Sequence, residues 1–108
     1  MLPQHLRLRK SADYMSVMRQ GRRVCRPTLV LYALGSEQAR VGLVVSKAVG
    51  GATVRNRVKR RLRHGALELI RDSHPMDVVV RALPGADSAS LKDDLGSAWA
   101  QAARQVTS

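Results

Sequence analysis

The chain of 108 residues contains no phenylalanine, and its aromatic residues are one tryptophan and two tyrosines. Modules that read RNA by stacking bases on paired aromatic side chains have few residues to use here, so this class is disfavoured. The core must instead be built from Val, Leu, Ile, Met and Ala. With 44% hydrophobic residues, the chain has enough of them to fold around a single core.

Cysteine occurs once, at Cys25, which excludes an internal disulfide and a zinc site made of several cysteines. No apolar stretch approaches the ~18 residues of a membrane-spanning helix. Residues 1–7 lack the apolar region of a signal peptide. We therefore expect a soluble, cytoplasmic protein that does not bind a membrane.

Acidic residues are scarce, since 8 Asp and Glu stand against 19 Lys and Arg, for a formal net charge of +11. Such a charge repels itself within the protein but raises the rate of encounter with a phosphate backbone. Fifteen of the basic residues are arginine, whose planar guanidinium can clamp a phosphate or stack on a base. RNA or DNA is therefore the expected partner.

The acidic and histidine residues form no recognisable catalytic or metal site in the sequence. A nuclease that uses two metal ions needs a compact set of carboxylates, whereas the adjacent Asp93 and Asp94 suit exposed positions on a helix. His5, His64 and His74 are isolated from one another. We therefore expect no catalytic residue and no metal ligand in the protein itself.

The spacing of apolar residues predicts an α+β fold in one domain that covers residues 1–108. Three segments have the spacing of helices, and three apolar runs, with a fourth and shorter one, have that of strands. We expect an α/β sandwich, in which a roughly four-stranded sheet is packed with helices and a basic helix follows the third strand. The expected helices are 12–20, 53–71 and 90–105, and the expected strands are 22–26, 28–34, 40–46 and 77–83.

Capping and turn residues predict how these elements begin and end. Ser11 and Thr53 are expected to cap the first two helices, and Gly21 to end the first one. Residues 35–38 suit a hairpin between the strands on either side of them. Residues 1–10 are expected to form an extended basic arm.

The second helix carries a dense basic run, because six of the nine residues from 55 to 63 are Arg or Lys. A charge run is usually a solvated face, but Glu68 is the one acidic residue placed to pair across this run, so most of the repulsion stays uncompensated. Phosphates would relieve it. An apolar stripe through Val54, Val58, Leu62, Gly65 or Ala66, and Leu69 fixes the buried side. The side chains that project away from this stripe are Asn56, Arg60 and Arg63.

The segment GLVVSK at 42–47, followed by Gly50 and by RNRVKRRLR at 55–63, resembles the signature of the bacterial ribonuclease P protein component. The resemblance extends over nearly the whole chain. It implies a small α/β sandwich that assembles with a catalytic RNA to remove the 5′ leader from precursor tRNA. The RNA would perform the hydrolysis with bound Mg²⁺, and the protein would bind no cofactor of its own.

In this family the protein binds the RNA and the single-stranded leader, and thereby strengthens substrate and metal binding. No obligate protein partner is evident. The resemblance implies an RNA-binding role for the basic helix and for the lysine of the preceding turn. These RNA-binding positions are Lys47, Arg55, Asn56, Arg57, Lys59, Arg60 and Arg63.

The resemblance also implies a leader-binding cleft between the first helix and the sheet, at Tyr14, Met18 and Tyr32. The alternative is that all three are core residues. Met18 stands where an aromatic is common, and its flexible thioether should be less specific for a base. Leu83 stands where the family often has a basic residue, which Arg81, two places earlier on the same strand face, could partly replace.

Two other functions remain open from the sequence. A structural RNA-binding protein, such as a ribosomal protein or an RNA chaperone, would be equally basic but would have no dedicated substrate. A basic helix on a membrane surface is less well supported, because its apolar stripe contains Gly65 and Ala66 and no aromatic anchor. Cleavage of precursor tRNA by a reconstituted complex would separate these possibilities.

Overall fold

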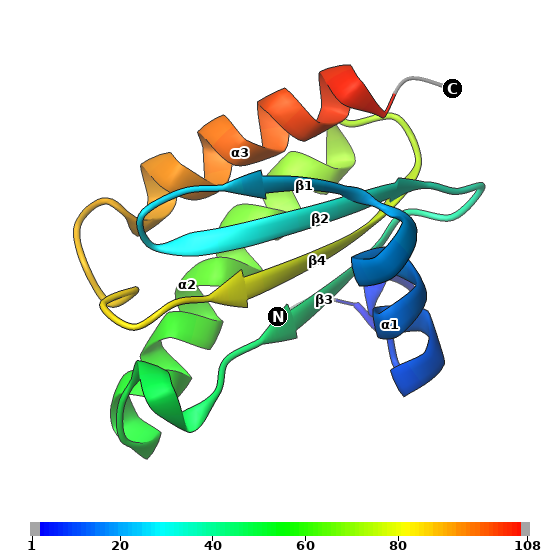
Figure 1. Ribbon diagram of the computed structural model, residues 1–108. Coiled ribbons are helices and arrows are strands. Elements are labelled where there is room, and N and C mark those ends of the chain that lie inside the picture. The colour runs from blue at the N-terminus through cyan, green and yellow to red at the C-terminus, as the bar shows by residue number, and fades with distance from the viewer. Residues whose placement is uncertain (1–2, 107–108) are drawn as a thin grey trace.

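A computed structural model describes residues 3–106 of the chain, which form one four-stranded sheet with helices on both faces (Figure 1). The elements in chain order are η1 (Gln4–Leu6), α1 (Ser11–Gln20), β1 (Arg22–Cys25), β2 (Leu29–Gly35), β3 (Arg40–Val44), η2 (Lys47–Val49), α2 (Ala52–Arg71), β4 (Met76–Ala82) and α3 (Leu91–Gln105). Helices α2 and α3 pack on one face of the sheet, and α1 packs on the other.

The predicted α+β fold is confirmed. Three α-helices and four strands lie where the apolar spacing placed them, and the basic helix follows the third strand. The short first strand is present. Gly21 ends α1 as predicted, and its N–H donates to the carbonyl of Val17 at 2.8 Å.

The predicted hairpin at residues 35–38 is wrong, because β2 and β3 are not neighbours in the sheet. The strand order is β1-β2-β4-β3, so β4 pairs antiparallel with β2 and parallel with β3. The first five residues of β4 are all buried, and a strand that is apolar on both faces is most stable in the middle of a sheet. Strand β3, which is less buried, lies at the edge.

Neither predicted N-cap is correct. Helix α1 begins at Ser11 itself, and α2 begins at Ala52, so that Thr53 lies inside the first turn. The residue before each helix makes no side-chain hydrogen bond to it. Before α2 the chain turns at Gly50, whose φ of +154° is accessible to glycine. After this turn α2 begins one residue before Thr53, so Thr53 cannot be its N-cap.

The N-terminal segment is folded onto the sheet and is not the extended arm predicted for residues 1–10. One turn of 3-10 helix forms at Gln4–Leu6, and Leu8 is buried. The N–H of Leu8 donates to the carbonyl of Val41 in β3 at 3.0 Å, and Arg7 forms a β-bridge with the same residue. The segment thus covers part of the β3 edge, which would otherwise expose unpaired backbone groups. The first two residues of the predicted arm lie outside the described residues.

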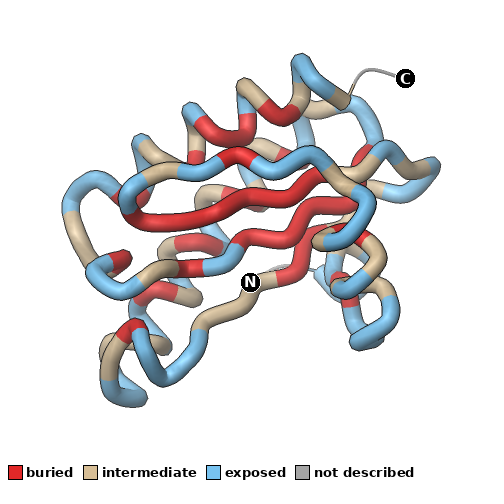
Figure 2. The backbone as a smooth tube through the Cα atoms, viewed as in Figure 1, coloured by how far each residue is buried: buried red, intermediate tan, exposed pale blue. Residues whose placement is uncertain are grey.

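The two faces of the sheet are covered to different extents (Figure 2). Between the sheet and the pair α2 and α3 lies the larger core, which contains Trp99 and the inward residues of both helices. On the opposite face α1 buries one residue, Val17, in a smaller cluster that includes Val30 and Val79. One face is therefore sealed, and the other is covered mainly where α1 lies.

A buried carboxylate joins the central strand to the edge strand. Asp77 in β4 is 6% exposed, and its two oxygens accept hydrogen bonds from Nε and Nη2 of Arg40 in β3, at 3.1 and 2.8 Å. The hydrogen bond to Asp77 raises the pKa of Arg40, against the opposing effect of burial. Arg40 also lies 3.6 Å from Asp13, so the same guanidinium connects the sheet to α1.

We predict that Asp77→Asn lowers the free energy of unfolding by about 1.5–3 kcal/mol, because it removes the buried negative charge and one of the two oxygens that accept hydrogen bonds from Arg40. Urea unfolding monitored by circular dichroism measures the change. Asp93→Asn, which alters an exposed acid on α3, is the matched control and should change the stability by less than about 0.5 kcal/mol. Equal and small effects of the two substitutions would contradict the structural role of Asp77.

Candidate nucleic-acid interface

The basic helix α2 is anchored by a buried stripe of residues four positions apart. Val58, Leu62, Ala66 and Ile70 are buried in the larger core, whereas Leu69 is half-buried. The stripe therefore ends at Ile70 and not at Leu69 as predicted, because a spacing of four shifts slowly around a helix of 3.6 residues per turn. The buried stripe holds the rest of α2 in a fixed orientation.

Most of the predicted RNA-binding side chains are accessible. Arg55 and Lys59 are half-buried at the margin of the stripe. The exposed positions are Lys47 in η2 and Asn56, Arg57, Arg60 and Arg63 in α2. Together these side chains form a surface of high positive charge along one side of the helix, which we call the basic ridge and define as the seven residues just named.

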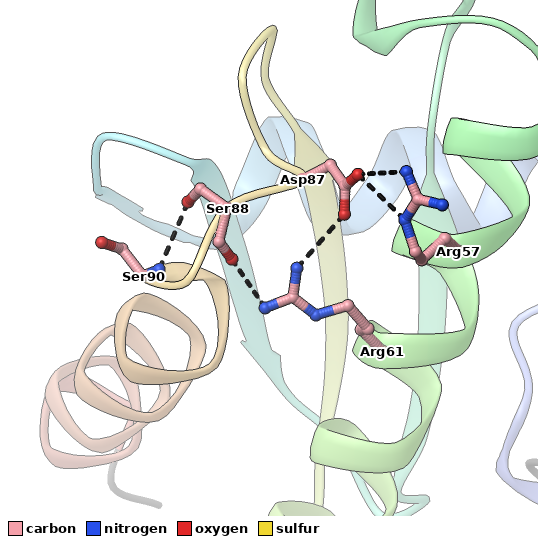
Figure 3. A network of polar contacts seen from close by, with 5 residues as sticks. All are labelled: Arg57, Arg61, Asp87, Ser88 and Ser90. Carbon is pink, nitrogen blue, oxygen red and sulfur yellow. Dashed lines mark hydrogen bonds and ion pairs between the residues drawn. The ribbon is translucent and has the colours of Figure 1, made fainter.

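Two arginines of α2 are tied to the loop that joins β4 to α3 (Figure 3). Nε and Nη2 of Arg57 both donate to Oδ2 of Asp87, at 2.9 and 2.6 Å. Nη1 of Arg61 donates to Oδ1 of Asp87 at 3.3 Å, and its Nη2 donates to the carbonyl of Ser88 at 2.6 Å. Among the described residues, the ion pairs made by α2 are those of Arg57 and Arg61 with Asp87.

Asp87 supplies negative charge beside the basic ridge, which was expected to have little acidic compensation. Helical spacing indicates Glu68 as a partner within the helix, but it gives no signal for Asp87, which lies 30 residues beyond Arg57. The hydrogen bonds from Arg57 lower the pKa of Asp87, although desolvation acts in the opposite direction. The same contact raises the pKa of Arg57. Asp87 is thus ionised at neutral pH and compensates part of the charge of the helix.

The three predicted cleft residues lie together on the sheet face that carries α1. Tyr14 and Met18 on α1 are half-buried, and Tyr32 on β2 is 8% exposed. The Tyr14 hydroxyl donates to the carbonyl of Leu8 at 3.3 Å. All three residues therefore belong to the smaller core cluster, and Tyr14 and Met18 also reach its surface, whereas Tyr32 is buried. Their binding of a leader stays a prediction.

Arg81 lies on the same sheet face as these residues. It is exposed on β4, directly opposite Val30 of β2 and Val44 of β3, and Val30 is two positions from Tyr32. Leu83 packs against the smaller cluster. Arg81 therefore supplies a cation to the part of this face that α1 does not cover.

A cavity of about 240 Å³ lies at the β3 edge and connects the basic ridge to the predicted cleft. Its polar rim includes Lys59 and Arg63 of α2 and Arg7 of the N-terminal segment, and Tyr14 forms part of its wall. The remaining lining residues are Leu8, Val41 and Leu43. Tyr14 and Lys59, which the sequence places 45 positions apart, thus line one cavity.

A hollow of about 850 Å³ lies beside η1 and the start of α1. Arg9, Lys10 and Arg40 line it with one acid, Asp13. The basic residues of this segment are evident in the sequence, but the hollow is not, because it depends on how the segment folds against the β2–β3 connection. Its basic lining extends the positive surface beyond α2.

Within residues 3–106 no three His, Cys, Asp or Glu side chains are grouped so that they could hold a metal ion. None of the helices described there is long and apolar enough to cross a membrane. The features that are present define a class of protein: a small α+β domain whose basic helix packs on one face of the sheet and approaches the partly covered opposite face at the β3 edge.

Comparison with known proteins identifies the family within this class. Residues 2–103 match the family model described as Ribonuclease P, and the chain belongs to this family. The Ribonuclease P protein component of Rhodococcus opacus is 50% identical over 104 residues, which cover 86% of this chain and 82% of the relative. That of Streptomyces bikiniensis is 46% identical over 113 residues, covering 91% and 92%.

Solved structures agree with the sequence relatives. The RNase P protein of Staphylococcus aureus matches with a TM-score of 0.82 and 26% identity, over 90% of this chain and 94% of that protein. The resemblance inferred from the motifs is therefore confirmed. Membership of this family sets aside the alternative that the chain is a ribosomal protein or an RNA chaperone.

The position of Tyr14 depends on Gly42 of β3. A Cβ atom on Gly42 would lie 2.5 Å from Cζ of Tyr14, whereas packed carbon atoms approach to about 3.5–4.0 Å. We predict that Gly42→Ala displaces the Tyr14 ring and lowers the free energy of unfolding by about 1–3 kcal/mol. Chemical denaturation measures the stability, and the NMR signals of the Tyr14 ring report its displacement.

Gly96→Ala is the matched control, because nothing lies within 4 Å of the added Cβ on this residue of α3. It should stabilise the helix by about 0.5–1 kcal/mol. A Gly42→Ala protein as stable as the parent, with unchanged Tyr14 signals, would show that the ring does not pack on this strand.

Proposed function

We propose that the protein holds the catalytic RNA of ribonuclease P and the leader of precursor tRNA on one continuous surface. Membership of the family makes the chain the protein subunit of this ribonucleoprotein, whose role is the removal of tRNA 5′ leaders. A partner RNA subunit follows from that membership. The shared cavity of Tyr14, Lys59 and Arg63 is the observation that supports one continuous surface.

The basic ridge would bind the backbone of the catalytic RNA and of nearby substrate. Each Lys or Arg that neutralises a phosphate releases condensed counterions, so the affinity falls steeply as salt rises. Arginine suits this role because its planar fork can donate two hydrogen bonds to one phosphate. Since the opposite side of α2 is buried, the backbone positions that carry the cations are fixed. Less of the protein therefore has to be ordered when RNA binds.

The leader would lie across the face that carries α1. Tyr14 and Met18 would contact bases, and Arg81 offers a cation on the same face. The cavity at the β3 edge would let a strand that leaves this face reach Lys59 and Arg63. The leader and the RNA near the cleavage site would thus be held by one protein domain.

Hydrolysis itself would be performed by the RNA, with Mg²⁺ bound in the complex of RNA and substrate, and the protein would supply no cofactor. The placement of the aspartates supports this division. Asp77 is engaged by Arg40, Asp87 by Arg57, and Asp94 by Thr28, whose hydroxyl donates to it at 2.6 Å. These carboxylates support the protein's own structure.

We predict that the purified protein restores cleavage of precursor tRNA by a bacterial ribonuclease P RNA at low Mg²⁺, where the RNA alone is nearly inactive. The positive charge of the ridge should offset the repulsion between the two RNAs that Mg²⁺ otherwise screens. Gel analysis of 5′-labelled precursor measures the reaction. The RNA alone at high Mg²⁺ is the positive control, and leader removal by protein free of RNA would contradict RNA catalysis.

We predict that Tyr14→Ala weakens binding of precursor tRNA to the reconstituted complex by about 1–3 kcal/mol, the usual contribution of a base stacked on an aromatic ring. Mature tRNA, which lacks the leader, should bind almost as before. Filter binding with both RNAs measures the difference.

Two control variants separate stacking from folding. Tyr14→Phe keeps the ring and loses the hydroxyl bonded to Leu8, so it should retain the preference for the leader. Met15→Ala removes an exposed neighbour on α1, 56% exposed, and should leave both RNAs unaffected. Equal weakening of precursor and mature tRNA by Tyr14→Ala would show that Tyr14 acts only in the core.

A further inference from the structure

We propose that Asp87 is a positioning residue for RNA binding, which holds Arg57 in the orientation that receives a phosphate. This inference rests on the proposed function of the basic ridge. It assigns a binding role to an acidic residue, although the net effect of an acid near RNA is ordinarily repulsive.

The geometry of Arg57 leaves part of its guanidinium available. A guanidinium has five N–H donors, and Asp87 accepts from Nε and from Nη2. Within residues 3–106 no partner is found for Nη1 of Arg57, and the side chain is 47% exposed. The edge of the guanidinium bound to Asp87 is held in place, which leaves Nη1 to bind a ligand.

Arg61 has a different role in the same network (Figure 3). It donates one hydrogen bond to Asp87 and one to the carbonyl of Ser88, and its side chain is 34% exposed. Arg61 therefore joins α2 to the loop and fixes the carboxylate from the opposite side. The ridge thus has Arg57 as a cation of fixed direction, whereas Arg61 is retained by the loop.

The loop that carries Asp87 is itself well anchored. Ala86 is fully buried, and its N–H donates to the carbonyl of Leu83 at 2.9 Å. The N–H of Ser88 donates to the carbonyl of Ala86 at 2.8 Å, and the N–H of Ser90 to the Ser88 hydroxyl at 3.3 Å. Asp87 therefore projects from a loop fixed on both sides of it, which allows it to orient Arg57.

Two effects of Asp87 on RNA binding oppose each other. Its charge repels phosphate, but between exposed groups this repulsion is screened by salt within about 8 Å at physiological ionic strength. Its hydrogen bonds remove the rotamer freedom of an arginine before RNA arrives, and ordering one long side chain changes affinity by about two- to tenfold. Positioning is the larger effect, because two hydrogen bonds hold Arg57 on the carboxylate, whereas the repulsion of phosphate by that carboxylate is screened.

The test compares Asp87→Ala with Asp93→Ala, which removes the same charge from an exposed position on α3. Affinity for a bacterial ribonuclease P RNA is measured over a series of salt concentrations, with thermal unfolding as the check of folding. Asp87→Ala should weaken binding about three- to tenfold although it makes the protein more positive. Asp93→Ala should leave binding unchanged or slightly stronger.

Asp87→Asn keeps the side-chain shape and one hydrogen-bond acceptor, so its RNA affinity should lie between those of the parent and Asp87→Ala. It replaces Asp87→Ala in the comparison if that variant does not fold.

A double-mutant cycle with Arg57→Ala separates positioning from a general effect on the fold. If Asp87 acts through Arg57, Asp87→Ala should have little further effect once Arg57 is removed, whereas a structural effect would add to it. Binding by Asp87→Ala as tight as that of Asp93→Ala, with Arg57→Ala still impaired, would overturn the positioning role and leave the proposed function standing. Unchanged RNA affinity and salt dependence in folded Arg57→Ala would instead remove Arg57 from the RNA surface, and the positioning role with it.

Discussion

Strand β4 forms hydrogen bonds to β2 on one side and to β3 on the other, and the arrangement of the binding surface depends on this double pairing. Since β4 occupies the centre, β3 lies at the edge, and α2, which connects β3 to β4, crosses one face of the sheet. The basic ridge is therefore carried past the edge of β3, where the N-terminal segment and Tyr14 also lie. A β2–β3 hairpin would have separated these groups.

The unequal covering of the two sheet faces gives each face a different use. The face under α2 and α3 contains the larger core and provides most of the buried apolar surface. The face under α1 buries fewer residues and leaves Arg81 exposed beside an apolar surface. Most of the buried apolar surface thus lies on one side of the sheet, and the other side combines apolar contacts with charge, which is the combination that the proposed binding of a single-stranded leader would require.

The sequence predicted the elements well because their signals are local. Apolar periodicity locates α2 and the fully apolar run locates β4, and the family signature points to the ridge. The features that could not be predicted from the sequence depend on contacts between distant segments of the chain. The order of the strands depends on which strands are buried on both faces. The docking of the N-terminal segment depends on one buried residue, Leu8, which lies among basic residues. Asp87 lies in a loop 30 positions from Arg57, and no periodic pattern connects them.

The buried stripe of α2 has a thermodynamic consequence, since the helix that carries most of the charge density also supplies Val58 and Leu62 to the main core. In the free protein, repulsion among the ridge cations acts directly on a core element, and any loosening of that core would let the cations move apart. RNA bound at the ridge, as proposed above, would remove this stress and, by mass action, would shift the folding equilibrium towards the native state. The RNA subunit would in this sense be a folding ligand of its protein.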